Sequence, residues 1–270
     1  MSWIPDLFRT EKPIIGMVHL KALPGTPLYD ESGGMAAIIE RARQDFAALT
    51  EGGIDAVMFC NESDRPYELR VGTEIAAAMA RVVTECIRGR DVVFGVDVLW
   101  DPVAAISIAH ATGASFVREV FTGVYAGDLG LWNTNCAEAI RHKRRIGASN
   151  LKLLYNIVPE FSQAVEPRPT ELVARSTVFS SLADVICVSG PMAGDGVPMA
   201  QLNSAKKALP DTPVFANTGV RHETVRDILG VADGAVVGTA FKLNRYTWNP
   251  VSKENVTTFM EIVREFRAKR

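Results

Sequence analysis

The sequence has few cysteines, and their spacing is not that of a metal site or a redox motif. Its 270 residues include only Cys60, Cys86, Cys136 and Cys187, and no two of them are spaced as CxxC. Cys60 and Cys187 fall within predicted strands, where cysteine packs as a small hydrophobic residue. We therefore expect free thiols in a reducing cytoplasm rather than a disulfide framework.

Long apolar runs and an excess of one charge are also missing. No apolar stretch is long enough to cross a bilayer, and residues 1–12 lack the apolar region of a signal peptide. The formal net charge is −2, with neither a basic tail nor a basic stripe. These absences argue against a transmembrane segment and against nucleic acid as a partner, and they favour a cytoplasmic location.

The regular alternation of strands and helices is the main positive signal. A chain of 270 residues with 47% hydrophobic residues can form one α/β barrel or two smaller domains. Short apolar strands are predicted at 14–19, 54–60, 92–98, 115–121, 151–155, 184–188, 214–216 and 235–237. Helical segments separate them, which predicts a parallel sheet covered by helices. Eight such units close into a single (β/α)8 TIM barrel over residues 1–270. A doubly wound open sheet is the alternative, but no Gly-x-Gly-x-x-Gly follows the first strand.

Three segments lie outside this alternation or close it. Trp3, Leu7 and Phe8 form a short apolar face that either plugs the bottom of the barrel or packs on a partner. Residues 122–135 are rich in glycine and are predicted to form a long loop. A closing helix is expected over residues 252–269, with Ser252 as its cap.

Two glycine turns follow the last two predicted strands, at 217–219 and 238–240. Glycine lets backbone N–H groups approach an anion, and a helix that starts at the second turn would point its positive end there. TIM barrels often hold phosphate after strands seven and eight, although two ordinary turns would look the same. The predicted phosphate site comprises Asn217, Gly219, Gly238 and Thr239, with Ser189 and Gly190 from strand six.

Charged residues within or just after strands are the candidates for catalysis. Lys152 and Glu119 lie in neighbouring apolar strands, where burying either alone would be costly. They predict an ion pair inside the barrel, which is either structural or a general acid–base pair; Lys152 could also form a Schiff base. Strand alternation leaves open whether Arg118 or Glu119 faces the barrel axis.

His19 and Glu62 end the first two strands and are predicted to position a substrate. The alternatives are a core histidine and a carboxylate that caps the next helix. His19, Glu62 and Asp97 have no diagnostic spacing for a metal site, so we expect no metal. The sequence identifies no cofactor.

Seven short motifs are distributed along nearly the whole chain: MVHL at 17–20, DAVMF at 55–59, VLWDP at 98–102, REVFTG at 118–123, NIVPE at 156–160, CVSG at 187–190 and ANTGV at 216–220. Together they resemble the BtpA family, which includes SgcQ-like proteins of bacterial sugar operons. The resemblance implies a barrel of the ribulose-phosphate-binding group. Sugar-operon relatives suggest carbohydrate metabolism, whereas cyanobacterial relatives are described as photosystem I biogenesis factors. Some relatives carry a nucleoside triphosphatase label, but this chain has no Gly-x-x-x-x-Gly-Lys-Ser/Thr loop.

Two hypotheses of function follow from these features. The first is an enzyme of isomerase, epimerase or aldolase type that acts on a small phosphorylated sugar or a related anion. The second is a non-catalytic factor for assembly of a membrane complex such as photosystem I, in which an exposed apolar patch would matter more. Either form could be a homo-oligomer.

Overall fold

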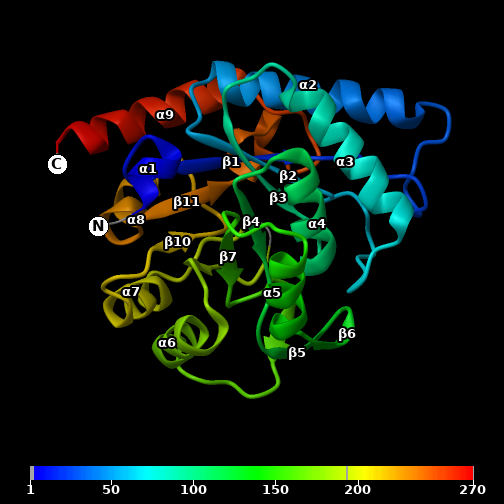
Figure 1. Cartoon of the computed structure of the whole chain (residues 1–270). Coiled ribbons are helices and arrows are strands. Elements are labelled where there is room, and N and C mark those ends of the chain that lie inside the picture. The colour runs from blue at the N-terminus through cyan, green and yellow to red at the C-terminus, as the bar shows by residue number, and fades with distance from the viewer. Residues whose placement is uncertain (1–2, 193, 270) are drawn as a thin grey trace.

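The computed structural model describes residues 3–192 and 194–269, and its centre is a closed barrel of parallel strands (Figure 1). In the described residues the barrel has eight strands: β1 (Ile14–His19), β2 (Ala56–Cys60), β3 (Val93–Asp97), β4 (Phe116–Glu119), β7 (Lys152–Asn156), β9 (Val185–Val188), β10 (Val214–Ala216) and β11 (Gly234–Val237). The first and last strands pair in parallel, with Ile15 opposite Val236, which closes the barrel. The predicted (β/α)8 barrel is confirmed.

Helices cover the outside of the barrel (Figure 1). They are α2 (Gly34–Glu51), α3 (Thr73–Ile87), α4 (Pro102–Thr112), α5 (Cys136–Arg145), α6 (Thr170–Ser181), α7 (Met199–Ala208), α8 (Val225–Val231) and α9 (Lys253–Ala268). The closing helix α9 starts where the sequence predicts, because the Ser252 hydroxyl accepts a hydrogen bond from the Asn255 N–H at 3.2 Å. Within the described parts of the chain, no helix combines the length and the apolar composition needed to cross a membrane.

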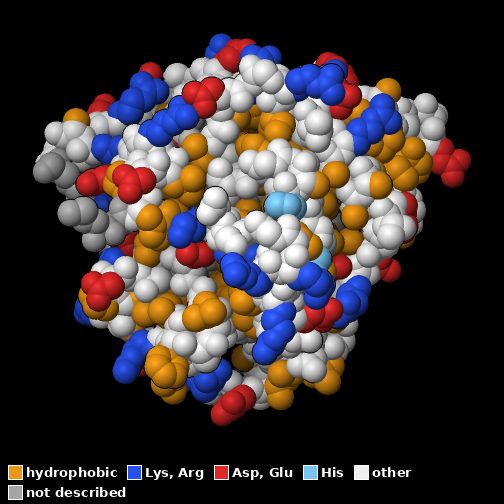
Figure 2. All heavy atoms as spheres, in the orientation of Figure 1, with side chains coloured by type: hydrophobic (Ala, Val, Ile, Leu, Met, Phe, Trp, Pro, Cys, Tyr) orange, Lys and Arg blue, Asp and Glu red, His pale blue; other side chains and the backbone are white. Residues whose placement is uncertain are grey.

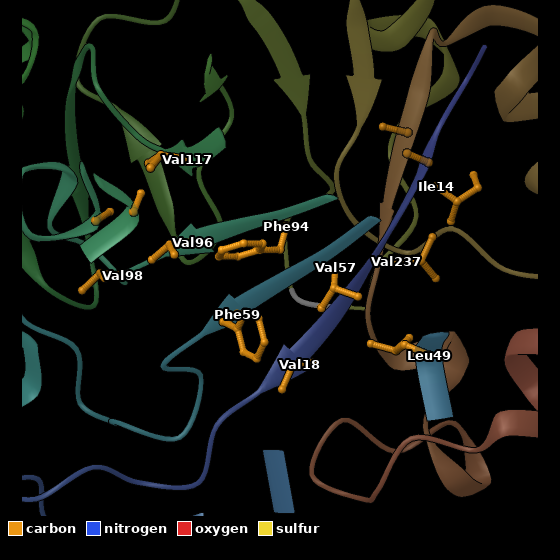
Figure 3. Packing of buried hydrophobic residues seen from close by; sticks show 14 of the residues in the cluster. Ile14, Val18, Leu49, Val57, Phe59, Phe94, Val96, Val98, Val117 and Val237 are labelled. Atoms are coloured by element: carbon orange, nitrogen blue, oxygen red, sulfur yellow. The ribbon is translucent and has the colours of Figure 1, made fainter. Parts of the chain in front are cut away.

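The alternation of side chains along each strand produces two packed layers. Outward-facing residues pack under the helices, as Val57 and Phe59 of β2 do beside Phe94 and Val96 of β3 (Figure 3). The Phe59 and Phe94 rings meet edge to face, with their centroids 6.4 Å apart. Residues one position away along the strands point into the barrel and form its own core. Which residues face inward, and so which reach the mouth, therefore follows from the strand register.

The N-terminal helix α1 (Ile4–Phe8) closes the bottom of the barrel. Ile4 and Phe8 are buried in the inner core, and the Phe8 ring centroid lies 5.7 Å from that of Phe116 and 6.4 Å from that of Phe215. Of the two roles that the sequence allows for this segment, the structure shows the plug. The bottom is therefore sealed by aromatic side chains, and the opposite end of the barrel is left for a site.

The glycine-rich segment predicted as a loop instead forms strands, so that prediction was wrong. β5 (Val124–Gly127), β6 (Gly130–Asn133) and β8 (Ser162–Ala164) make a small antiparallel sheet in the order β6-β5-β8. Tyr125 and Trp132 are opposite one another, with ring centroids 5.6 Å apart, and Trp132 lies 5.0 Å from Trp100. These aromatic rings are buried over the barrel mouth, and their packing stabilises short strands whose glycine content alone predicts a loop.

Candidate functional site

Polar side chains at the C-terminal ends of the barrel strands form one inward-facing layer at the mouth. Arg118 of β4 belongs to this layer and makes a buried ion pair with Asp97 of the neighbouring strand β3. The inward position at the end of β4 is therefore held by Arg118 rather than by Glu119. Above the layer is a cavity, called the central cavity here, whose lining includes His19, Glu62, Tyr67, Trp100, Arg118, Glu160, Asn217, Gly238, Thr239 and Thr247.

Glu62 borders the central cavity with a carboxyl group that titrates near neutral pH. Burial, and then the negative charge of Asp97, raise its pKa to about 7. The Cys60 thiol donates a hydrogen bond to Glu62 Oε2 at 3.5 Å, and His19 Nε2 lies 3.9 Å from the same oxygen. The predicted proximity of His19 and Glu62 to one site is thus present in the structure. A carboxyl group with a pKa close to 7 can either give or take a proton at physiological pH.

His19 ends β1 beside Glu62, with a largely buried side chain that is 10% accessible at the cavity wall. Burial, and then the positive charge of Lys242, lower its pKa well below the ordinary histidine value. The imidazole is therefore neutral near pH 7. Within the described residues its Nδ1 atom has no hydrogen-bond partner, although it is buried. A neutral ring of this kind can donate a hydrogen bond to a substrate oxygen without carrying a full charge.

Glu160 is a second buried carboxylate at the same cavity, and the sequence did not single it out. Asn156 Nδ2 donates to Glu160 Oε2 at 3.1 Å, and Asn217 Nδ2 reaches Glu160 Oε1 at 3.5 Å. Burial raises the pKa of Glu160. It lies in a loop, four residues past the end of β7, so strand periodicity gave no signal for it. Its place at the end of the NIVPE motif was the only hint that the sequence offered.

Glu119 does not line the cavity, and its predicted pairing with Lys152 is wrong. Its carboxylate lies behind Asp97 and accepts a hydrogen bond from the Val98 N–H at 2.8 Å. Burial, and then the negative charge of Asp97, raise the pKa of Glu119 well above its ordinary value. Glu119 thus acts on the site through its contact with the end of β3 and through its charge interaction with Arg118.

Lys152 lies at the opposite end of the barrel from the mouth. It is the first residue of β7, and its Nζ is 3.0 Å from Asp184 Oδ1 and 4.7 Å from the centre of the Trp3 ring. The predicted strand at 151–155 has Lys152 near its start, and the start of a barrel strand lies at the end opposite the mouth. The geometry assigns Lys152 to the sealed bottom, so it is corrected from a catalytic to a structural residue.

The two predicted glycine turns line a second cavity of about 210 Å³, called the glycine cavity here. Its lining is Gly194, Gly219, Val220, Arg221, Gly238, Thr239, Ala240 and Arg245. Gly219 has a φ of 59°, and a Cβ on it would lie 2.2 Å from the Asp195 backbone, so only glycine fits there. Four of these residues, including Gly238 and Thr239, also border the central cavity. The two arginines were not predicted from the sequence: Arg221 adds positive charge to the cavity, whereas Arg245 is paired with Glu223 at 2.8 Å.

Three other residues assigned to phosphate do not line the glycine cavity. Ser189 is fully buried and hydrogen bonds to Asn156 and Asn217, at 3.2 and 2.8 Å. The Gly190 N–H donates to Thr218 Oγ1 at 2.5 Å. Asn217 borders only the central cavity, through a side chain that also supports Glu160. The Ser189 hydroxyl, the Gly190 N–H and the Asn217 Nδ2 group are thus already used to hold the end of the barrel in shape.

An aromatic vestibule of about 410 Å³ adjoins the central cavity and shares Glu62 and Glu160 with it. Its aromatic lining is Tyr67, Trp100, Trp132, Phe161 and Trp248. The extra sheet formed by β5, β6 and β8 contributes one wall, so the unpredicted strands shape access to the mouth. In the described part of the chain, no group of three or more His, Cys, Asp or Glu side chains is arranged to hold a metal ion.

Comparison with known sequences assigns the chain to a family. The model of the BtpA family matches residues 10–265. The chain belongs to the BtpA family. It is 48% identical over 267 residues to SgcQ of Escherichia coli (strain K12), a match that covers 99% of this chain and 100% of SgcQ. It is also 30% identical to the photosystem I biogenesis protein BtpA of Synechocystis, over 96% of this chain and 90% of that protein.

Comparison with solved structures finds the same fold at low sequence identity. (S)-3-O-geranylgeranylglyceryl phosphate synthase from Thermoplasma acidophilum, solved with sn-glycerol-1-phosphate, gives a TM-score of 0.63 at 14% identity and covers 98% of this chain and 99% of its own. Phosphoribosyl anthranilate isomerase from Thermus thermophilus gives 0.56 at 12% identity, covering 94% and 100%. These similarities identify the barrel fold and leave the chemistry to the site itself.

Proposed function

We propose that this protein is an enzyme that moves a proton on a small phosphorylated sugar or a related anion. One observation carries the proposal: Glu62 and Glu160, two buried carboxyl groups with raised pKa values, border one cavity that opens into the glycine cavity. Acid–base pairs with raised pKa values at the mouth of a barrel are typical of active sites.

The glycine cavity would hold the phosphate group. Backbone at Gly219, Gly238 and Thr239 borders it, and the Arg221 and Arg245 side chains line it as well. Arginine matches phosphate geometry and remains charged at all physiological pH values. Both solved structures compared above have a phosphate compound in their names, which supports a phosphate ligand here. Their sequence identity to this chain is only 14% and 12%.

The central cavity would perform the chemistry on a carbonyl group of the bound sugar. Glu62 in its ionised form would take the proton from the carbon next to the carbonyl, while the electron pair moves to the carbonyl oxygen. Arg118 and the neutral His19 ring border the cavity and would stabilise that oxygen. Glu160 would return a proton to the neighbouring carbon or oxygen, which gives an isomerase or epimerase.

A Schiff-base aldolase is a weaker match to the same site. Such a reaction requires an amine that can reach the substrate carbonyl. The described lining of the central cavity contains no lysine, and Lys152 is at the other end of the barrel. The geometry therefore favours isomerase or epimerase chemistry over the aldolase alternative.

Exchange of substrate protons with solvent tests this function directly. The protein would be incubated in deuterated water with individual pentose and hexose phosphates, and deuterium at the carbon next to the carbonyl would be followed by NMR. We expect exchange with at least one compound, and its loss in Glu62→Gln and in Glu160→Gln. Glu68→Gln is the matched control, since Glu68 is exposed and is not among the lining residues of the central cavity. Exchange in none of the compounds, or exchange that survives both cavity variants, would refute the proposal.

A role in assembly is the second candidate, and the surface of α6 is the observation that favours it. Leu172, Phe179 and Leu182 are exposed, with Phe179 90% accessible. Hydrophobic side chains are visible over α6 in Figure 2. Contiguous exposed apolar surface commonly marks a protein contact. Under this candidate Phe179→Asp would abolish the cellular function while ligand binding at the mouth stayed unchanged; under the enzymatic proposal the same variant would keep its activity.

A further inference from the structure

A third cavity at the barrel mouth is lined by positive charge. Its volume is about 280 Å³, and we call it the basic cavity. Lys21, Arg41, Arg65 and Lys242 line it together with His19. No Asp or Glu is among its described lining residues. The proposed isomerase or epimerase chemistry uses none of these four cations, so the cavity needs a separate explanation.

The two cations deepest in the basic cavity share a single carboxylate. Asp45 Oδ1 lies 3.2 Å from Arg41 Nε, and Asp45 Oδ2 lies 3.0 Å from Lys242 Nζ. Asp45 also accepts a hydrogen bond from the Val251 N–H at 2.8 Å, which fixes the carboxylate in place. Two positive charges against one negative charge leave an excess of positive charge in a buried position, where screening by solvent is weak.

The two outer cations add to this excess. Lys21 is only loosely paired, 4.0 Å from Asp30, and both of these side chains are about half exposed. The Arg65 guanidinium stacks on the Trp248 ring at 3.9 Å, and within the described residues it makes no ion pair with a carboxylate. Stacking holds the guanidinium in place before any ligand arrives, which reduces the entropy lost on binding.

The basic cavity is connected to the proposed active site through two residues. His19 and Thr247 border both the basic cavity and the central cavity. Thr247 Oγ1 lies 3.0 Å from Thr239 Oγ1, and Thr239 belongs to the glycine cavity. The positive charges of Lys242 and Arg41 reach His19 strongly enough to help lower its pKa. Cationic cavities therefore adjoin the central cavity at two different places.

We infer that the substrate carries two anionic groups, with one phosphate in the glycine cavity and a second phosphate or carboxylate in the basic cavity. The carbon atoms between them would then cross the central cavity beside His19 and Glu62. This inference rests on the proposed function and specifies its substrate class: a sugar bisphosphate or a phosphorylated sugar acid. Two charged ends would also fix which carbon faces the catalytic carboxyl groups.

Calorimetric titration with matched probes tests the inference. The probes are ribulose 5-phosphate with ribulose 1,5-bisphosphate, fructose 6-phosphate with fructose 1,6-bisphosphate, and 6-phosphogluconate, whose second anion is a carboxylate. We expect at least one compound with two anionic groups to bind about tenfold or more tightly than its monophosphate partner, as expected for an added charge-assisted contact.

Variants at the outer cations separate the two anion sites. In Lys21→Met/Arg65→Gln the advantage of the second anion should disappear while monophosphate affinity is kept, because both changes lie outside the glycine cavity. Arg221→Gln should instead weaken monophosphate and bisphosphate alike. Arg43→Gln is the matched control on α2: Arg43 pairs with Glu85 on the surface and does not line the basic cavity.

The possible outcomes distinguish this inference from the proposed function. Equal affinity for mono- and bisphosphates overturns the second anion site and leaves the enzymatic proposal standing. A second outcome is that inorganic phosphate strengthens monophosphate binding while bisphosphates bind no more tightly than monophosphates. The basic cavity would then bind a separate anion, and the inference that one substrate fills both cavities would be wrong. Absence of binding for every probe, inorganic phosphate included, contradicts the proposed function itself.

Discussion

Replacing Glu62 by glutamine should change how the stability of the protein depends on pH. Burial raises the pKa of Glu62 from its ordinary value of 4.5 to about 7. Each pKa unit corresponds to about 1.4 kcal/mol, so keeping this carboxylate ionised in the folded state costs about 3 kcal/mol. Glutamine has almost the same shape and has no charge to bury. The variant should therefore avoid that cost.

The direction of the effect follows from proton binding. Because the folded-state pKa is the higher one, the folded protein keeps a proton on Glu62 that the unfolded chain has already lost between pH 4.5 and about pH 7. The contribution of Glu62 to stability is therefore fully present below pH 4.5, falls as the pH rises to about 7, and is constant above that. The stability of Glu62→Gln relative to the parent should rise by about 3 kcal/mol across the same window.

Urea unfolding at several pH values between 5 and 8.5 measures this difference. Comparison of the two proteins at each pH cancels the titration of all groups that they share, apart from those coupled to Glu62. Glu68→Gln, at an exposed position in the same loop, controls for loss of a glutamate as such. A stability difference between Glu62→Gln and the parent that does not change with pH would refute the assignment of a raised pKa, and with it the basis for Glu62 as a proton carrier near pH 7.

Three further predictions concern other parts of the barrel. Gly238→Val should abolish binding of phosphorylated sugars by calorimetry while the protein still folds, because a Cβ there lies 3.1 Å from His19 Cε1; Gly230→Val, where a Cβ meets nothing within 4 Å, should bind normally. Arg118→Met should lower the free energy of unfolding by about 3–5 kcal/mol because it leaves Asp97 buried without its counter-charge, and adding Asp97→Asn should recover part of the loss. Lys152→Met should cost only about 0–1 kcal/mol in urea unfolding and leave ligand affinity unchanged, since its ion pair is partly exposed at the barrel bottom.

The fold was predictable from sequence because every barrel unit repeats the same signal. Strand β2, for example, is apolar throughout, since one face meets the helices and the other meets the inner core. An error of one or two residues in a predicted strand boundary does not hide such a pattern. The β5–β6 hairpin was missed because its stability comes from the packing of Tyr125 and Trp132 with Trp100. Trp100 is distant in sequence from the hairpin, and two glycines lie between Tyr125 and Trp132.

The site was only partly predictable, because strand alternation determines facing but not depth. His19 and Glu62 were found because both stand at or just beyond the end of a strand. Lys152 points inward as well, yet it starts its strand and so emerges at the bottom, 3.0 Å from Asp184. The predicted strand at 151–155 already places Lys152 near the N-terminal end, which is the bottom of a barrel, so the error was to take an inward-facing residue for one at the mouth. Glu160 was missed because it lies in a loop, outside any strand pattern. It is held at the cavity by hydrogen bonds from Asn156, at the end of β7, and from Asn217, in the loop after β10.

The distribution of charge around the mouth connects these elements into one argument about substrate. The basic cavity holds more cations than carboxylates and the glycine cavity adds Arg221, whereas the central cavity contains carboxyl groups whose raised pKa values favour their neutral forms. A neutral molecule would gain nothing from the outer charges, and a substrate with a charged middle would meet the carboxyl groups. A compound that is anionic at its ends and uncharged between them satisfies all three cavities. Because the charges of Lys242 and Arg41 help to lower the pKa of His19, an anion bound beside them would offset those charges and should raise the pKa of His19 in the complex.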